Sequence, residues 1–189
     1  MKKYILAIIA LIGLVCVSCT YSVSKSADET PDSTAVGAES PRYLSSDLAF
    51  FGLYGRVKSV TEDGVLSLEF DQNGLLVSVF GTPASQRYNR DKQGRIVEMN
   101  GYENHVVYEW GDERPVGSEA QAEGMTLRES YTYDERGFVV EINHSDDGEV
   151  SVEAFSYPEV DKQGNWTKRT SEGYEYTVGT TTRVIEYYE

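Results

Sequence analysis

Residues 131–138 read Tyr131-Thr132-Tyr133-Asp134-Glu135-Arg136-Gly137-Phe138, and this short stretch decides the fold. Aromatic residues alternate with a polar one up to the aspartate, and a glycine follows that aspartate by three positions. At this spacing the aspartate accepts a hydrogen bond from the backbone two residues later, and the glycine takes the left-handed conformation that closes a tight hairpin. The stretch therefore predicts two antiparallel strands joined by a short turn.

The same turn recurs along the chain. Asp-x-x-Gly is also found at residues 71–74, 91–94 and 161–164, each time shortly after an aromatic residue. Random placement of the same residues would give about one match, so four copies indicate a structural repeat. Two weaker copies, at residues 61–64 and 145–148, have a hydroxyl residue at the aspartate position.

The segments between these turns are rich in Val, Ile, Tyr and Thr, which favour strands. They lie at residues 53–60, 66–70, 75–80, 95–99, 105–110, 131–133, 138–142, 150–157 and 180–188. Residues 118–128 come closest to a helical pattern, but Gly124 interrupts them and a loop beside a strand fits equally well. We predict an all-β domain, an antiparallel meander of about ten strands in one strongly twisted sheet. The sequence allows either an open sheet or a half-barrel.

Residues 131–138 resemble the YD repeat of RHS-type proteins, and residues 161–169 with 183–188 are similar to the C-terminal part of small RHS-repeat-like bacterial lipoproteins. The resemblance covers residues 52–189 and implies a sheet built from successive hairpins. Large RHS proteins wind such repeats into a shell around a toxin. This chain has too few copies for a shell, so the resemblance does not imply that function.

The N-terminus predicts export. Residues 1–18 combine an early basic start, Lys2 and Lys3, with an apolar run over residues 5–17, which is typical of a signal peptide. Ser18-Cys19 resembles the lipobox of bacterial lipoproteins, although Cys16 stands where Leu is usual. We expect Cys19 to be acylated and to tether the protein to a membrane. Secretion with cleavage near Ser18 and no lipid is the alternative.

The following residue is Thr20 and not the aspartate that retains lipoproteins at the inner membrane, so we expect an outer-membrane lipoprotein facing the periplasm or the surface. Residues 19–44 are rich in Ser, Thr, Ala and acidic residues and predict a flexible linker. Residues 45–189 form the predicted hairpin domain. This domain contains no cysteine, so burial without disulfides must stabilise it.

The formal net charge is −14, and loss of Lys2 and Lys3 with the leader makes it two units more negative. A chain this acidic repels nucleic acid, which is excluded as a partner. Anionic polysaccharide and anionic lipid surfaces are disfavoured for the same reason.

Residues for catalysis or metal binding are few. The only histidines are His105 and His144, and their spacing fits no metal motif. Asp71-x-Asn73-Gly74 resembles part of a calcium loop but lacks the remaining ligands. The acidic residues alternate with apolar ones, as on a solvated sheet face. We therefore predict no catalytic residues, no metal and no cofactor.

The strongest hint of binding is the aromatic content, with fourteen Tyr, two Trp and six Phe. Trp110, Tyr133 and Trp166 are the candidate residues for a binding platform, although a core position explains such rings more simply. Two hypotheses follow. The first is a non-catalytic envelope lipoprotein that binds a protein or a glycan. The second is a carrier or enzyme for a small lipid or sugar, with its site in the concave face of the sheet.

Overall fold

The structure is a computed structural model that describes residues 43–189 except 103, 123, 147, 174 and 175. The predicted signal peptide, Cys19 and the linker up to residue 42 lie outside the described residues. Within the described part of the chain, no helix is long and apolar enough to cross a bilayer.

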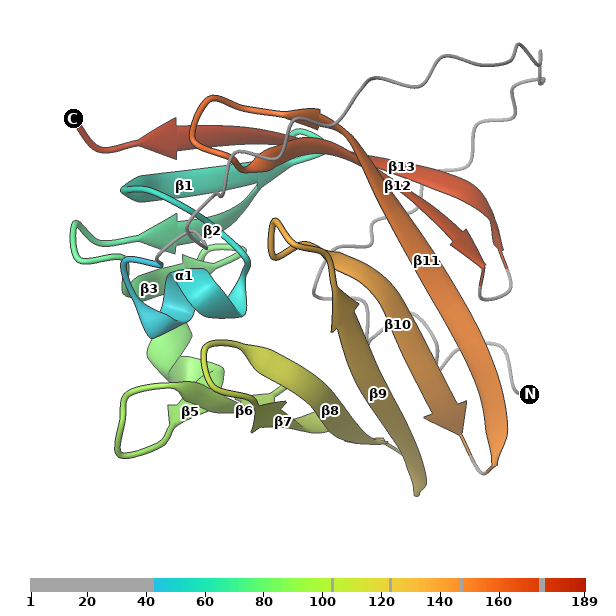
Figure 1. The fold of residues 1–189 in the computed structure, drawn as a ribbon. Helices are drawn as coiled ribbons and strands as arrows, with labels where there is room; N and C mark the ends of the chain where they lie inside the picture. Colours follow the sequence, from blue (N-terminus) through green and yellow to red (C-terminus); the bar gives the residue numbers. More distant parts are fainter. Residues whose placement is uncertain (1–42, 103, 123, 147, 174–175) are drawn as a thin grey trace, which may run out of the picture.

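The prediction of an all-β meander is confirmed, with thirteen strands in one sheet where about ten were expected (Figure 1). The strands are β1 (Val57–Glu62), β2 (Val65–Phe70), β3 (Leu76–Val79), β4 (Thr82–Pro83), β5 (Tyr88–Arg90), β6 (Ile96–Asn100), β7 (Asn104–Trp110), β8 (Pro115–Ala122), β9 (Met125–Tyr133), β10 (Val139–Asp146), β11 (Glu149–Val160), β12 (Trp166–Gly173) and β13 (Tyr176–Tyr187). Each strand pairs antiparallel with its neighbours. Of the segment 118–128, left open by the sequence, residues 118–122 lie in β8 and residues 125–128 in β9.

The four Asp-x-x-Gly turns have the predicted chemistry. In the turn at Asp71, the carboxylate Oδ1 accepts the backbone N–H groups of Asn73 at 2.8 Å and Leu75 at 2.9 Å. The four turn glycines all have φ between +78° and +92°. In each turn the aspartate N–H donates to the carbonyl four residues later and the glycine N–H donates to the aspartate carbonyl, so three residues, 72–74 in the first turn, connect the two strands.

The weaker turn copies form a different kind of hairpin. Glu62 pairs with Val65, so the β1–β2 turn is the two-residue pair Asp63-Gly64, with φ of 46° and 82°. Asp146 pairs with Glu149 in the same way. The Asp63-Gly64 turn, with positive φ at both residues, suits the right-handed twist of a hairpin, so the prediction that Thr61 acts in place of aspartate is wrong. Ser145 likewise lies within β10, paired with Val150, and does not begin a turn.

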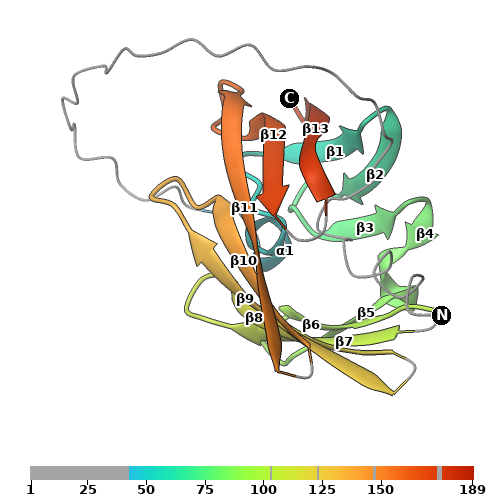
Figure 2. The same cartoon turned by 90° about the vertical axis from the view of Figure 1, so that its right-hand side faces the viewer.

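The sheet curls until its two edges nearly meet. Its strand order runs β4-β3-β2-β1-β13-β12-β11-β10-β9-β8-β7-β6-β5, so the first and last strands of the domain, β1 and β13, pair with each other inside the sheet. The edges β4 and β5 are consecutive in sequence and are joined by a short 3-10 helix, Ala84–Gln86. Figure 2 shows the sheet wrapped around α1 (Ser46–Phe50). The sheet remains open between β4 and β5, which gives the half-barrel form of the prediction.

The helix α1, which the sequence did not predict, ties the two edges together. Asp47 is fully buried, and its Oδ2 accepts the backbone N–H of Leu76 on β3 at 2.6 Å. The same carboxylate pairs with the Arg90 guanidinium on β5 through both oxygens. One side chain thus bridges the gap that the backbone leaves open.

The Asp-x-x-Gly turns gather around this N-terminal segment. Ser45 Oγ donates to the carbonyl of Gly74 at 2.6 Å, and Ser46 Oγ to that of Gly94 at 3.4 Å. The Tyr54 hydroxyl donates to the carbonyl of Arg136, while its backbone N–H donates to Asn165 Oδ1 at 2.7 Å. The repeated turns therefore hold residues 45–54 as a plug at one end of the half-barrel.

The concave face has an apolar half and a polar half. The main hydrophobic cluster draws its fully buried members from the plug, from β1–β3, Ala84 and β5–β9. Among the described residues, none of its members comes from β10, β11 or β12. The concave side of β10–β12 is therefore lined by something other than the main core, whereas β13 packs Ile185 and Tyr187 against it.

Candidate functional site

The concave face of β9–β13 and β1 carries a row of buried and half-buried charges, which we call the ionic strip. Strand register places Glu62 opposite Arg183 and Glu129 opposite His144. Glu153 shares its face of β11 with Ser151, which lies opposite His144, and Arg169 lies opposite Thr181, which shares its face of β13 with Arg183. The strip consists of Glu62, Glu129, His144, Glu153, Arg169 and Arg183. It contains three carboxylates and three cationic groups.

His144 lies at one end of the strip between two glutamates. It is 8% exposed, its Nδ1 is 3.3 Å from Glu129 Oε1, and its Nε2 is 3.8 Å from Glu153 Oε2. Burial alone lowers the histidine pKa, but hydrogen bonding and attraction from the two carboxylates outweigh it and raise the pKa to about 9. At neutral pH His144 is therefore an imidazolium.

Glu129 is held by further donors. Its Oε2 accepts the hydroxyl of Ser118 at 3.0 Å and that of Tyr131 at 2.9 Å. The Tyr131 hydroxyl also lies 2.9 Å from Ser118 Oγ. These donors fix the carboxylate in one orientation.

Arg183 forms the other end of the strip. Its Nε donates to Glu62 Oε1 at 2.6 Å, and its guanidinium carbon lies 3.5 Å from the centre of the Trp166 ring. Burial lowers the pKa of this guanidinium from its ordinary value, and attraction to Glu62 opposes the shift. The Nη1 atom of Arg183 is buried and has no hydrogen-bond acceptor among the described residues.

Arg169 lies next to Arg183 and contacts the same ring. Its guanidinium carbon is 5.1 Å from the centre of Trp166 and 4.8 Å from the centre of Phe155. Such distances are typical of cation–π contacts. Two guanidinium groups and two aromatic rings therefore share the concave side of β11–β13.

This part of the concave face is not sealed. The Glu153 side chain is 18% exposed, and Ser151, Phe155 and Ser171 are half-buried. All four lie on the inner face of β11 and β12, facing the ionic strip. The arrangement can bind a polar ligand through fixed charges and aromatic rings.

The three residues of the predicted platform do not share one surface. Trp166 is 5% exposed and packs with Tyr54 and Phe138 in a second, smaller core cluster. Trp110 packs against the main cluster, and its Nε1 donates to the carbonyl of Ile96 at 2.7 Å. The Tyr133 hydroxyl donates to the carbonyl of Pro115 at 2.6 Å, and Arg114 stacks on its ring at 4.4 Å.

The sequence does not predict the ionic strip, because acidic residues that alternate with apolar ones are typical of a solvated sheet face. That interpretation is wrong for Glu62, Glu129 and Glu153, which lie on the inner face. A signal was present in the alternation: Glu129 shares its phase with Leu127 and Tyr131, and both are buried. The phase of a charged residue relative to its apolar neighbours therefore indicates its face better than its polarity does.

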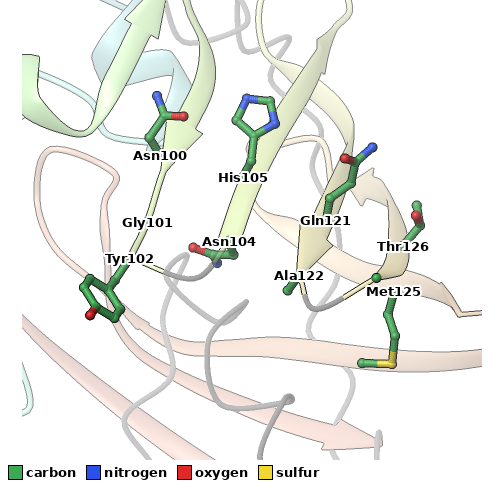
Figure 3. Close-up of a pocket in the computed structure, with 10 residues that line it drawn as sticks. Asn100, Gly101, Tyr102, Asn104, His105, Gln121, Ala122, Met125 and Thr126 are labelled. Atoms are coloured by element: carbon green, nitrogen blue, oxygen red, sulfur yellow. The ribbon is translucent and has the colours of Figure 1, made fainter.

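A separate open hollow of about 660 Å³ lies at the ends of the β6–β7 and β8–β9 hairpins (Figure 3). Its lining is mostly uncharged and polar: Asn100, Gly101, Tyr102, Asn104, His105, Gln121, Ala122, Gly124, Met125 and Thr126. Figure 3 shows His105 and Gln121 pointing to one side of the sheet and Asn104 and Met125 to the other. Because these side chains point in different directions, they do not converge on one ligand. The hollow is therefore a weaker candidate site than the ionic strip, with which it shares no residue.

The described residues offer no metal site: among them, no three His, Cys, Asp or Glu side chains have an arrangement suited to a metal ion.

Comparison with known proteins does not identify a family for this chain. A scan against family models gives no match for this chain, and a search of curated proteins also gives none. The resemblance to YD repeats therefore stays a prediction from the turn motif, and the site is interpreted from its own chemistry.

Proposed function

We propose that this chain is a non-catalytic binding protein of the bacterial envelope, anchored at the outer membrane through Cys19, and that its concave face takes a small polar ligand. The ionic strip is the observation that carries this proposal. Ligand sites are concave and combine apolar walls with a few fixed polar groups. The concave side of β10–β13 has both, in the rings of Phe155 and Trp166 and in the charges beside them.

Stability alone gives a poor account of the strip. Charges taken out of water cost several kcal/mol each, and well-packed apolar residues of similar size are often as stable or more stable. The strands β1–β3 and β5–β9 fill their concave side with such apolar residues. Four of the six charges of the strip lie on β10–β13, and the other two, Glu62 of β1 and Glu129 of β9, face them, which supports a binding role for that half.

The state of the histidine supports the non-catalytic part of the proposal. A general base must be free to accept a proton near the working pH. His144 is already protonated at neutral pH between Glu129 and Glu153. It is suited to holding charge in place.

The proposal is tested by filling the concave face. The full chain is incubated with a defined mixture of amino acids, dipeptides, oligosaccharides, dicarboxylates and short fatty acids, and retained molecules are identified by mass spectrometry after gel filtration. Ser151→Trp places a large ring beside the strip, because Ser151 lies on the inner face opposite His144. Val152→Trp is the matched control on the exposed outer face of the same strand.

We expect the native chain and Val152→Trp to retain the same molecule and Ser151→Trp to lose it. Equal retention by both variants, or no retention by the native chain, contradicts the proposal. Thermal unfolding of both variants checks that the fold is intact.

A second candidate function is protein binding through the outer face. Val184 and Leu66 are exposed there and both lie opposite Thr61, so two apolar side chains flank a threonine across three adjacent strands. A photo-crosslinking residue at position 184 should then give a discrete protein adduct in intact cells. The same residue at position 150, another exposed valine on β11, is the control and should give none.

A further inference from the structure

We infer that the ligand of the concave face carries a carboxylate, which binds the free edge of the Arg183 guanidinium. This inference rests on the proposed concave binding site and adds the chemical class of its ligand. It is carried by the geometry of Arg183, Glu62 and Trp166.

The side chain of Arg183 is only partly satisfied. It is 8% exposed, and the one hydrogen bond described for it uses Nε, which donates to Glu62 Oε1. The Nη1 atom is buried without an acceptor among the described residues. A buried charged donor without an acceptor is destabilising, since it has lost water and gained no partner. A ligand oxygen at this position would remove that penalty.

The guanidinium is also preorganised. Stacking at 3.5 Å on Trp166 fixes its plane, and the bond to Glu62 fixes its rotation in that plane. The planar fork of an arginine matches the two oxygens of a carboxylate, and a fork that is already oriented loses little entropy on binding. The unused edge of Arg183 is therefore suited to a planar anion.

Local charge favours an anion as well. Around the Trp166 ring stand two guanidinium groups, Arg169 and Arg183, and the carboxylate of Glu62. The other two carboxylates of the strip, Glu129 and Glu153, face the imidazolium of His144. A chain of net charge −14 thus holds a local positive excess on its concave face.

The aromatic rings indicate the rest of the ligand. Phe155 is half-buried on the inner face, next to the Arg169 guanidinium and one strand away from Trp166. An apolar or aromatic group attached to the carboxylate would pack on these rings while its charge meets Arg183. We therefore expect an aromatic or branched apolar carboxylate to bind more tightly than a bare anion such as acetate.

The test compares two probes of the same shape. Sodium benzoate and neutral benzamide are titrated into the full chain at constant ionic strength, and binding is measured by saturation-transfer NMR. Arg183→Gln removes the fork, and Arg183→Lys keeps the charge but not the fork. Arg114→Gln is the matched control, because Arg114 also stacks on an aromatic ring and also has a buried Nη1 without an acceptor among the described residues.

We expect benzoate to bind and benzamide to bind at least tenfold more weakly. Arg183→Lys and Arg183→Gln should each weaken benzoate binding about tenfold or more, and Arg114→Gln should leave it unchanged. Equal binding of the two probes by the native chain overturns the inference without any variant. Unchanged benzoate binding by a folded Arg183→Lys overturns it too.

Failure here is distinct from failure of the proposed function. If the native chain retains a neutral molecule and Ser151→Trp loses it, the proposed concave binding site stands and the inference of a carboxylate ligand is contradicted. Retention of no molecule in the mixture, with no benzoate binding, would contradict both.

Discussion

Asp47 is the residue on which closure of the half-barrel depends most directly. It comes from α1 and yet bonds to β3, the neighbour of the edge strand β4, and to β5, the other edge strand. Its carboxylate is fully buried, and so is its bond to the Leu76 N–H, whereas the Arg90 side chain is 31% exposed. A change at this one position should therefore act on both edges of the sheet.

We predict that Asp47→Ala destabilises the domain by about 3–5 kcal/mol, because it leaves Arg90 without its buried partner. Urea unfolding followed by circular dichroism measures the change. The matched control is Lys58→Ala, which removes the exposed ion pair with Glu186 and should cost under about 1 kcal/mol. Equal, small effects of the two changes would contradict the bridging role of Asp47.

Because of His144, the free energy of unfolding should fall as the pH becomes alkaline. Its folded pKa of about 9 lies above its unfolded value of 6.5, so the folded state binds the proton more tightly. The stabilisation is complete below pH 6.5 and is lost as the pH rises through 9. Free energies of unfolding measured from pH 6 to 9.5 should fall for the native chain.

The control for this prediction is the other histidine. His144→Gln should flatten the pH profile, whereas His105→Gln should leave it unchanged, because the His105 side chain is 43% exposed while that of His144 is 9% exposed. A native profile that matches that of His144→Gln would show that the buried imidazolium contributes nothing.

At the scale of elements, the Asp-x-x-Gly turns have two tasks that can be separated. Each turn reverses the chain, and some also pack against the plug. Gly74 and Gly94 have nearly the same φ, +78° and +81°. A Cβ at Gly74 would lie 2.7 Å from Leu48 Cδ1, whereas a Cβ at Gly94 would meet nothing within 4 Å.

We predict that Gly94→Ala costs about 1–2 kcal/mol, the strain of a left-handed residue with a side chain. Gly74→Ala should cost clearly more, because it adds a clash with a fully buried leucine of α1. Thermal unfolding of the two variants gives the comparison. If both cost the same, the turn at Gly74 contributes only a chain reversal and does not hold the plug.

At the scale of the whole molecule, the fold is stabilised by the pairing of its two ends. Val60 of β1 pairs with Ile185 of β13, so the first and last strands are neighbours. Ile185 and Tyr187 also pack against the main hydrophobic cluster. Contacts so distant in sequence form slowly, because a long loop must close first.

A chain that stops after residue 175 should therefore lose cooperative unfolding, although twelve of the thirteen strands are present. It would expose the edges of β1 and β12 and open the core. Urea unfolding and gel filtration test this, with a chain that stops after Tyr188 as the control. A sharp unfolding transition of the shorter chain would show that the sheet is stable without its closing strand.

The local elements could be predicted from the sequence because their causes lie within a few residues. The turn at Asp71 depends on a side chain and two backbone groups at most four residues away. Strands β8 and β12 were missed because small and polar residues such as Gly117, Ser118 and Ser171 carry little strand preference. Neighbouring strands on either side decided their conformation.

The sequence by itself determined the class, the antiparallel order and the chemistry of the repeated turns, since each of these rests on local geometry. Only the tertiary structure decided that α1 bridges the open edge and that Glu62, Glu129 and Glu153 face inward. These features depend on how far the sheet curls and on which strands meet across it. The reason is that a charge is buried by all the elements that surround it in space, and the residues next to it in the chain do not specify which elements those are.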